Sequence, residues 1–343
     1  MMQAAIAANN GGTTPQGNSD VDVILASFDT TYAWNYGSVK EGLRDLYEKA
    51  KREQWNGTTQ LAWKTEVDPE SEIIPQSYNP LEDYGPYKKF SSKQVKHFRH
   101  AQMAWQLSQF MHGEQGALIV ASQLTGAVPW MDAKFYAATQ TMDEARHVEV
   151  FSRYLSEKLE WEWPINANLK KLLDAIICDR RWDFKYLGMQ ILVEGLAMAA
   201  FSNMYQLAQE PLIKDLVHYV MKDESRHVAF GVISLKGYYD DMPESERRDR
   251  EDFVIEGCEL MRDRLLALEV ADYMGLDRNE VRRIVLDSPV MKMFRQSLFA
   301  RVVPNIKRLG LLTPYVRHHF ERLEIAQFED FDPEAQDQML GLN

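Results

Sequence analysis

The chain has 343 residues, of which 45% are hydrophobic and 26% charged, which is the composition of a globular protein. Its formal charge of −12 argues against nucleic acid as a partner, because binding to nucleic acid depends on Lys and Arg neutralising phosphates. Cys178 and Cys258 are too few for a disulfide framework or a zinc finger, and they indicate a reduced compartment.

The first thirty residues are predicted to form a flexible polar tail. They lack the basic segment and the long apolar segment of a signal peptide. No apolar run in the chain reaches the roughly 18 residues that span a bilayer, so we expect a cytoplasmic protein that does not enter a membrane. A helix is predicted over 39–55, followed by an irregular stretch over 56–90 that is rich in Pro, Asn, Gly and Tyr.

From Ser91 onward the pattern of apolar residues is helical. Ser91 or Ser92 is expected to cap a helix that ends near Leu124, before Thr125-Gly126, and Pro129 suits the first turn of a helix that reaches about Glu160. No strand alternation is present, so the sequence predicts an all-α fold. Further helices are predicted over 166–181, 184–209, 211–240 and 243–273, and near 277–310 and 314–327. The expected single helical domain covers 31–343, with a four-helix core over about 91–240 and accessory helices over about 241–330.

One five-residue pattern occurs twice, as DEARH over 143–147 and as DESRH over 223–227, eighty positions apart. Each copy contains Glu-x-x-His. Thirty residues before the glutamate of each copy lies another glutamate in an apolar context, Glu114 and Glu194. The equal offsets indicate an internal duplication of two helix hairpins.

This pattern predicts a pair of metal ions. Residues three apart lie on one face of a helix, so each Glu-x-x-His pair can point into a bundle centre. A lone carboxylate on an apolar face is costly unless a proton, cation or metal neutralises it. A single Glu-x-x-His is more often a solvated pair, but two copies with matched glutamates favour a metal site. The predicted ligands are Glu114, Glu144, His147, Glu194, Glu224 and His227.

The donor types narrow the choice of metal, and the neighbouring residues suggest how the ligands are held. Carboxylates and imidazoles without a thiolate favour iron or manganese over structural zinc. A histidine that binds metal normally donates its second N–H to an acceptor. We predict that Asp223 accepts from His147 and that Asp143 accepts from His227, each across the hairpins. Two arginines are predicted to balance these aspartates, with a place on the surface as the alternative: Arg146 and Arg226.

These motifs resemble the ferritin-like diiron carboxylate superfamily, in particular its ribonucleotide-reductase-R2-like and bacterial multicomponent monooxygenase branches. Gly113-Glu114 followed by TMDEARH is similar to the first hairpin of monooxygenase hydroxylases. VEGLAMAAF followed by KDESRHVAFG is similar to the second hairpin of R2-like oxidases. The resemblance covers about 95–240. It implies a ferritin-like bundle, the six ligands named above, and activation of O2 by two reduced iron ions, with a Mn/Fe pair as the alternative.

Positions near the ligands depart from the specialised branches. The tyrosine of radical-generating R2 subunits is replaced by Phe151, and the tyrosine of ether-cross-linked R2-like oxidases by Met189. The additional histidine of aryl-amine N-oxygenases is replaced by Val220, and the threonine common in monooxygenase hydroxylases by Met198. Ferritins are much shorter. A stand-alone oxygenase or oxidase is therefore the preferred interpretation.

In this interpretation the four glutamates are the catalytic carboxylates, and O2 hydroxylates, desaturates or N-oxygenates a small organic substrate. The substrate, apolar or aromatic in part, is expected against Phe110, Ala117, Phe151 and Met198, with plain core packing as the alternative for each. No GxGxxG motif for a nucleotide is present, so the electrons are expected from a ferredoxin or a flavin reductase. The chain is expected to form a homodimer. The alternatives are an R2-like radical-generating or redox subunit, and a ferroxidase or metal-binding protein without an organic substrate.

Overall fold

The computed structural model describes residues 21–75 and 79–342, and within them the chain is helical and contains no strand. The predicted all-α class is therefore confirmed. Residues 1–20 of the predicted tail over 1–30 lie outside the described residues. The rest of that tail, residues 21–30, forms no helix.

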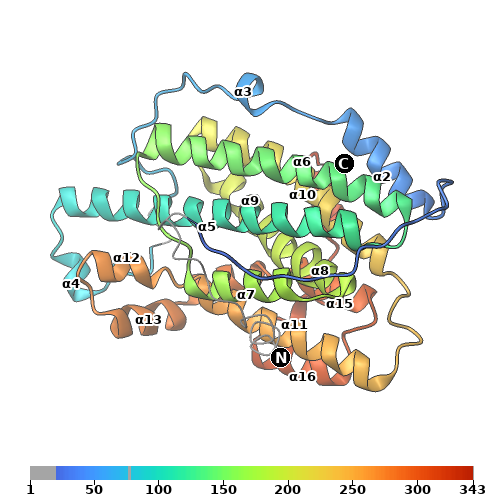
Figure 1. The fold of residues 1–343 in the computed structure, drawn as a ribbon. Helices are drawn as coiled ribbons and strands as arrows, with labels where there is room; N and C mark the ends of the chain where they lie inside the picture. Colours follow the sequence, from blue (N-terminus) through green and yellow to red (C-terminus); the bar gives the residue numbers. More distant parts are fainter. Residues whose placement is uncertain (1–20, 76–78, 343) are drawn as a thin grey trace.

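Four long helices form the centre of the molecule (Figure 1). α5 (Ser92–Ala127) packs along α6 (Met131–Tyr154), and a helix over Trp182–Leu207 packs along α10 (Pro211–Leu235). α6 also contacts α10, which joins the two hairpins into one bundle. These are the two hairpins predicted from the duplicated motif, and the predicted four-helix bundle with additional helices is confirmed.

The third helix of the bundle contains a π-helical segment directly before Glu194. Such wider turns rotate the following side chains around the helix axis and are frequent at functional sites. The sequence predicts one uninterrupted helix over 184–209, because no proline interrupts this stretch and Gly188 alone does not indicate a wider turn. The helix consists of α8 (Trp182–Tyr186), the π-helical segment η3 (Leu187–Val193) and α9 (Glu194–Leu207).

This third helix is also the most apolar one. One of its 18-residue windows has a mean hydropathy of 1.2 and would be long enough to cross a membrane, but 94% of that window is buried inside the protein. The burial identifies it as the core helix of the bundle, which explains its composition without a bilayer.

The ends of α5 and α6 follow local chemistry. Ser91 caps α5 by a capping box: the N–H of Gln94 donates to Ser91 Oγ at 3.3 Å, and the N–H of Ser91 donates to Gln94 Oε1 at 3.0 Å. The helix does not end before Thr125-Gly126 as predicted: it continues to Ala127, and the Thr125 hydroxyl donates to the carbonyl of Ala121 within it. α6 runs into a π-helical segment, η2 (Leu155–Leu159), and ends at Glu160, as predicted.

The remaining helices cover the bundle from two sides. α2 (Glu41–Arg52) packs on α6 and α10. On the other side, α7 (Ala167–Cys178) packs against α5, and α11 (Glu244–Arg264) packs against η3 (Figure 1). The irregular stretch contains only two short helices, α3 (Gly57–Gln60) and α4 (Gly85–Lys88). The others are α7 (Ala167–Cys178), α11 (Glu244–Arg264), α12 (Leu268–Tyr273), α13 (Arg278–Asp287), α14 (Pro289–Ser297), α15 (Val302–Arg308), α16 (Pro314–Arg322), η4 (Ala326–Phe328) and α17 (Pro333–Met339), the last of which was not predicted.

Candidate metal centre

Six acidic and imidazole side chains meet in the middle of the bundle. All are at most 5% exposed, so none relies on water to stabilise its charge. One glutamate comes from α5, one from the start of α9, and a Glu-x-x-His pair comes from each of α6 and α10. The structure brings together all six predicted ligands: Glu114, Glu144, His147, Glu194, Glu224 and His227.

The donor atoms of these residues form two overlapping groups of four, each within 4.8 Å. Glu144 and Glu224 belong to both groups, so they are placed to bridge two ions. Glu114 and His147 complete one group. The other group is completed on the opposite hairpin by Glu194 and His227.

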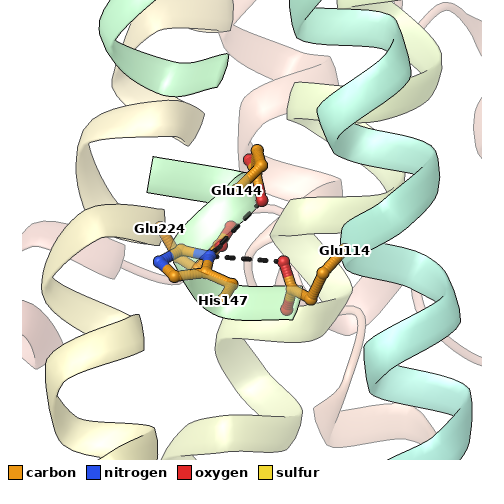
Figure 2. Close-up of side chains that lie close together, drawn as sticks. All are labelled: Glu114, Glu144, His147 and Glu224. Atoms are coloured by element: carbon orange, nitrogen blue, oxygen red, sulfur yellow. Dashed lines mark hydrogen bonds and ion pairs between the residues drawn. The ribbon is translucent and has the colours of Figure 1, made fainter. Parts of the chain in front are cut away.

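His147 presents Nδ1 to the carboxylates and Nε2 to an aspartate. Its Nδ1 lies 3.1 Å from Glu224 Oε1 and 3.3 Å from an oxygen of each of Glu114 and Glu144 (Figure 2). Its Nε2 lies 3.0 Å from Asp223 Oδ2. Nδ1 is therefore the nitrogen that faces the candidate metal position.

His227 has the same arrangement with the hairpins exchanged. Its Nδ1 lies 3.0 Å from Glu144 Oε1, and its Nε2 lies 3.4 Å from Asp143 Oδ2. Both of the predicted crossed contacts between a histidine and the aspartate of the other hairpin are thus present. An acceptor on Nε2 fixes the tautomer that leaves Nδ1 free to bind metal.

Several atoms of the cluster are buried without a hydrogen-bond partner among the described residues. They are both carboxylate oxygens of Glu224, Oε2 of Glu144 and Glu194, and Nδ1 of His227. An unsatisfied buried polar group costs about 1–3 kcal/mol, and hard oxygens with imidazole nitrogens suit divalent iron or manganese. The residues therefore fit two metal ions, as the sequence predicted.

Without metal, the cluster is neutralised by protons. Burial, reinforced by the nearby carboxylate of Glu224, raises the pKa of Glu114 and of Glu194 well above the usual range. Burial alone would lower the pKa of His147 and His227, but the surrounding carboxylates outweigh it and raise both pKa values well above the usual range. The raised pKa values of these four groups favour their protonated forms, and a metal ion that binds there displaces the protons.

We accordingly expect metal binding to release protons and to weaken as the pH falls. The sign follows from the raised pKa values, because protons compete with the metal for the same atoms. Titration of the metal-free protein with Mn(II) in weakly buffered solution measures the release, and repeating the titration at several pH values measures the affinity. An affinity that does not change between about pH 6 and pH 8 would contradict this charge balance.

The two arginines of the duplicated motif hold the aspartates in place. Arg146 Nη2 lies 2.9 Å from Asp223 Oδ2 and also forms an ion pair with Asp143. Arg226 forms an ion pair with Asp223 and lies 3.8 Å from Asp143 Oδ2. Both arginines are buried, so the alternative that they lie on the surface is wrong.

Residues directly after α2 complete this network, and no pattern in the sequence indicated them. Trp55 Nε1 donates to Asp223 Oδ2 at 2.6 Å, and Gln54 Nε2 donates to Asp143 Oδ1 at 2.9 Å. Glu53 forms an ion pair of 2.8 Å with Arg226. These residues lie about ninety positions before the first motif and share no spacing with it.

Two glutamines inside the bundle were also missed, although the helical period could have found them. Gln140 lies one turn before Glu144, and Gln190 one turn before Glu194. The Gln140 amide donates to Glu144 Oε1 at 3.0 Å and to Glu194 Oε1 at 2.7 Å, and the Gln190 amide donates to Gln140 at 3.3 Å. Gln140 thus links Glu144, which belongs to both groups of candidate ligands, to Glu194, which belongs to only one of them.

Two helix hairpins that each supply one glutamate and one Glu-x-x-His pair to a buried centre form the ligand pattern of ferritin-like di-metal carboxylate proteins. This chain has that architecture. No family model and no curated protein sequence matches the chain. Among solved structures it is similar to an R2-like ligand-binding oxidase with an aerobically reconstituted metal cofactor after photoconversion (17% identity, TM-score 0.49, covering 78% of this chain and 93% of that one). It is also similar to a variant of an R2-like ligand-binding oxidase with an anaerobically reconstituted Mn/Fe cofactor (18% identity, TM-score 0.46, covering 79% and 93%).

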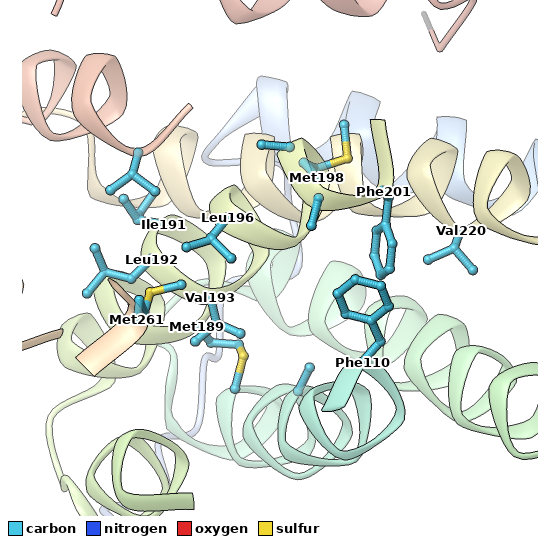
Figure 3. Packing of buried hydrophobic residues seen from close by; sticks show 14 of the residues in the cluster. Phe110, Met189, Ile191, Leu192, Val193, Leu196, Met198, Phe201, Val220 and Met261 are labelled. Atoms are coloured by element: carbon cyan, nitrogen blue, oxygen red, sulfur yellow. The ribbon is translucent and has the colours of Figure 1, made fainter. Parts of the chain in front are cut away.

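A small pocket of about 20 Å³ adjoins the cluster on its carboxylate side. Phe110 and Ala117, both predicted, are part of its wall, together with Ala197 and Phe201. The rings of Phe110 and Phe201 point toward one another, with centroids 4.7 Å apart (Figure 3). Apart from Gln109 and Arg264, the wall beside the ligands is apolar, as expected for a partly apolar substrate.

Phe151 and Met198, the other two predicted pocket residues, lie in the hydrophobic core instead of in this wall. Phe151 stacks against Phe201, with centroids 5.8 Å apart. On α9 the residues that line the pocket are three and seven positions after Glu194, whereas Met198 is four positions after it. An offset of four was expected for the pocket, but the side chain at that position turns into the core.

A larger pocket of about 190 Å³ lies next to the small one. The two pockets share three lining residues, Gln109, Phe110 and Arg264. Its rim includes Glu72 and Val290, which are exposed, so the larger pocket reaches the surface. Most other side chains of its wall are apolar, and they include Ile73, Met103, Trp105, Met204, Leu207 and Phe294.

Proposed function

We propose that this protein is a diiron oxidoreductase that uses O2 to oxidise an organic, partly apolar substrate, as a monooxygenase or an oxidase. The observation that supports the proposal best is the buried six-ligand cluster, beside a small pocket that adjoins the larger, mainly apolar one. A metal store or a structural metal site needs no such pocket, whereas an organic substrate needs both the pocket and the redox centre.

When bound, a pair of iron ions would supply electrons for O2 and the positions at which O2 binds. Glu144 and Glu224, which belong to both groups of candidate ligands, would help to hold both ions, and the burial of all six ligands excludes bulk water. Glu114 and Glu194 line the small pocket, so their carboxylates lie between the metal positions and the substrate space. There they can hold a proton beside the reacting oxygen, because burial already raises the pKa of each.

The proposal is tested by anaerobic loading with Fe(II), followed by exposure to O2 with and without candidate substrates. We expect two iron ions per chain, a change in the visible spectrum on O2 exposure, and an oxidised organic product. Fewer than two ions per chain would contradict the site. Stoichiometric oxidation of iron with no product from any organic candidate would favour a ferroxidase. Continued turnover should require an external donor, for which we propose a ferredoxin or a flavin reductase, and we propose a homodimer as the working assembly.

A second candidate function, a redox subunit that serves a larger partner, is favoured by one observation. His147, Asp223 and Trp55 are joined by hydrogen bonds of 3.0 and 2.6 Å, and Trp55 stacks on the half-buried Tyr219 with ring centroids 4.9 Å apart. This line of residues leads from the cluster toward the surface and is suited to moving an electron.

A Trp55→Phe variant separates the two functions, because it removes the indole N–H while keeping an aromatic ring. For an oxygenase we expect slow turnover with an external donor but a normal product yield in a single turnover of protein reduced beforehand. A redox subunit would instead lose transfer to its partner altogether while still reacting with O2. Single-turnover product analysis beside steady-state rates measures the difference, with Trp63→Phe as the control outside this line.

A further inference from the structure

A third pocket, of about 230 Å³, lies among the accessory helices and is lined by several positive charges. Its wall comes from the last turns of α11 and α13, from α14 and from the end of α16, and it shares no lining residue with the two pockets beside the metal centre. Among the described residues of this wall the only acid is Glu324. The cations of the wall are Arg262, Lys292, Arg295 and Arg322. Four cations against one acid leave an excess of three positive charges, in a chain whose net charge is −12.

Arg295 is the buried member of this basic pocket, with 7% of its surface exposed. Its two Nη atoms donate to the carbonyls of Val285 at 2.6 Å and Leu286 at 2.9 Å, at the end of α13. These carbonyls carry only partial negative charge, and no described acid pairs with Arg295. Burial, reinforced by the positive charge of Arg262, lowers the pKa of Arg295. Two guanidinium groups are therefore held close together, an arrangement that favours binding of an anion.

The other two cations of the pocket are accessible to a ligand. Arg322 is exposed and forms no hydrogen bond or ion pair with any residue that the structure describes. Lys292 Nζ lies 2.7 Å from Glu324 Oε1, and the Gln296 amide donates to Glu324 Oε2 at 3.4 Å. Lys292 and Glu324 are about half exposed, so water weakens their ion pair and an anionic ligand can compete with the carboxylate for Lys292.

We propose that this basic pocket binds the phosphate group of a small organic phosphate. Guanidinium groups present paired N–H donors that match phosphate oxygens. A carboxylate would neutralise one of the three excess charges, whereas a phosphate monoester carries roughly −1.5 to −2 near neutral pH. The inference goes beyond the proposed oxidation, because this pocket has no residue in common with the metal centre or with the substrate space.

The rest of the wall indicates what the phosphate is attached to. Beside the cations the pocket is lined by apolar side chains, namely Leu286, Phe299, Leu323 and Ile325. Polyphosphate alone would leave these side chains without a partner, whereas a ring or a short chain would cover them. A volume of about 230 Å³ is just below the roughly 300 Å³ at which typical small-molecule sites begin. The ligand is therefore a phosphate ester with one compact, partly apolar group.

The test compares phenyl phosphate, inorganic phosphate and benzoate by calorimetric titration of the full chain loaded with Mn(II), at constant ionic strength near neutral pH. Phenyl phosphate carries both the charge and the ring, inorganic phosphate lacks the ring, and benzoate has the ring with a single charge. We expect phenyl phosphate to bind about tenfold more tightly than benzoate, and more tightly than inorganic phosphate. Equal affinities for phenyl phosphate and benzoate would overturn the proposal.

Two variants place the binding in the pocket. Arg322→Gln should lower the affinity for phenyl phosphate about tenfold and leave the melting temperature unchanged, because Arg322 has no partner to lose. Glu324→Gln should raise the affinity about threefold, because it removes the carboxylate that competes for Lys292. A gain of affinity cannot result from a damaged fold, so the two variants together distinguish a binding role from a structural one.

Arg282→Gln is the matched control, since Arg282 is an exposed arginine of α13 that has no partner among the described residues and does not line the pocket. It changes the net charge by the same amount as Arg322→Gln and should leave the affinity unchanged. Equal losses in both variants would show attraction to the surface charge as a whole and would overturn the pocket. Binding that requires Mn(II) and is indifferent to Arg322→Gln would place phenyl phosphate at the metal centre and would overturn it as well.

This inference and the proposed function can fail separately. Phenyl phosphate that binds to the metal-free protein and depends on Arg322 would support the basic pocket, even if the iron-loaded protein oxidised no organic candidate. Oxidation of an organic substrate by a protein that binds phenyl phosphate no better than benzoate would support the oxygenase and overturn the phosphate site.

Discussion

Replacing Glu144 by alanine is expected to abolish binding of both metal ions. Glu144 belongs to both groups of candidate ligands, whereas Glu114 and Glu194 belong to one group each. Its loss also removes one of the two carboxylates that accept from Gln140, and the carboxylate that lies 3.0 Å from His227 Nδ1. Glu114→Ala, by contrast, should mainly lower the affinity for the ion that His147 helps to bind.

Metal content after loading and desalting measures this difference, and O2-dependent oxidation should fall in parallel. Glu149→Ala is the control, because Glu149 lies on the same helix but is exposed and faces away from the cluster. Two ions retained by Glu144→Ala would show that the metals do not bind where the two groups overlap.

The second large effect is expected from Gly231→Ala. A Cβ at Gly231 would lie 2.6 Å from the Cβ of Gln190 and 3.2 Å from Cδ1 of Ile191, both in the π-helical segment. The Cβ of Gln190 cannot move without its backbone, so η3 must shift away from α10. Overpacking of this kind costs about 1–3 kcal/mol, against the roughly 1 kcal/mol that alanine gains over glycine in a helix.

We therefore expect Gly231→Ala to lower the free energy of unfolding and to weaken metal binding, because Glu194 directly follows the displaced segment. Chemical denaturation and metal titration measure the two effects. Gly42→Ala provides the matched control, since a Cβ there would make only an ordinary contact of 3.6 Å with Ile233, and it should be neutral or slightly stabilising. An unchanged metal affinity in Gly231→Ala would mean that η3 does not position Glu194.

The duplicated motif predicted the centre of the site because its spacing carries three-dimensional information. Helical periodicity places Glu144 beside His147, and the equal offset of thirty residues relates Glu114 and Glu194 to the two Glu-x-x-His pairs. The pairing of each histidine with the aspartate of the other hairpin was predicted from the need of each histidine for a hydrogen-bond acceptor. The first two relations lie within single hairpins, where sequence separation translates directly into position.

The parts that sequence could not predict depend on packing between distant segments. Trp55 reaches Asp223 across 168 residues, and Arg264 meets the pockets only because the end of α11 lies against the bundle. Ala197 and Met198 both lie about one turn after Glu194 on α9, so the helical period could not decide which of them lines the small pocket.

The two sides of the cluster differ in chemistry, and this difference bears on the order of events during turnover. The pocket touches only carboxylate ligands, whereas both histidines face the aspartates and arginines beneath α2 and Trp55. We infer that an electron donor docking near α2 would not compete with a substrate that enters from the rim at Val290. Both could be bound at once, which gives a ternary complex rather than alternating half-reactions.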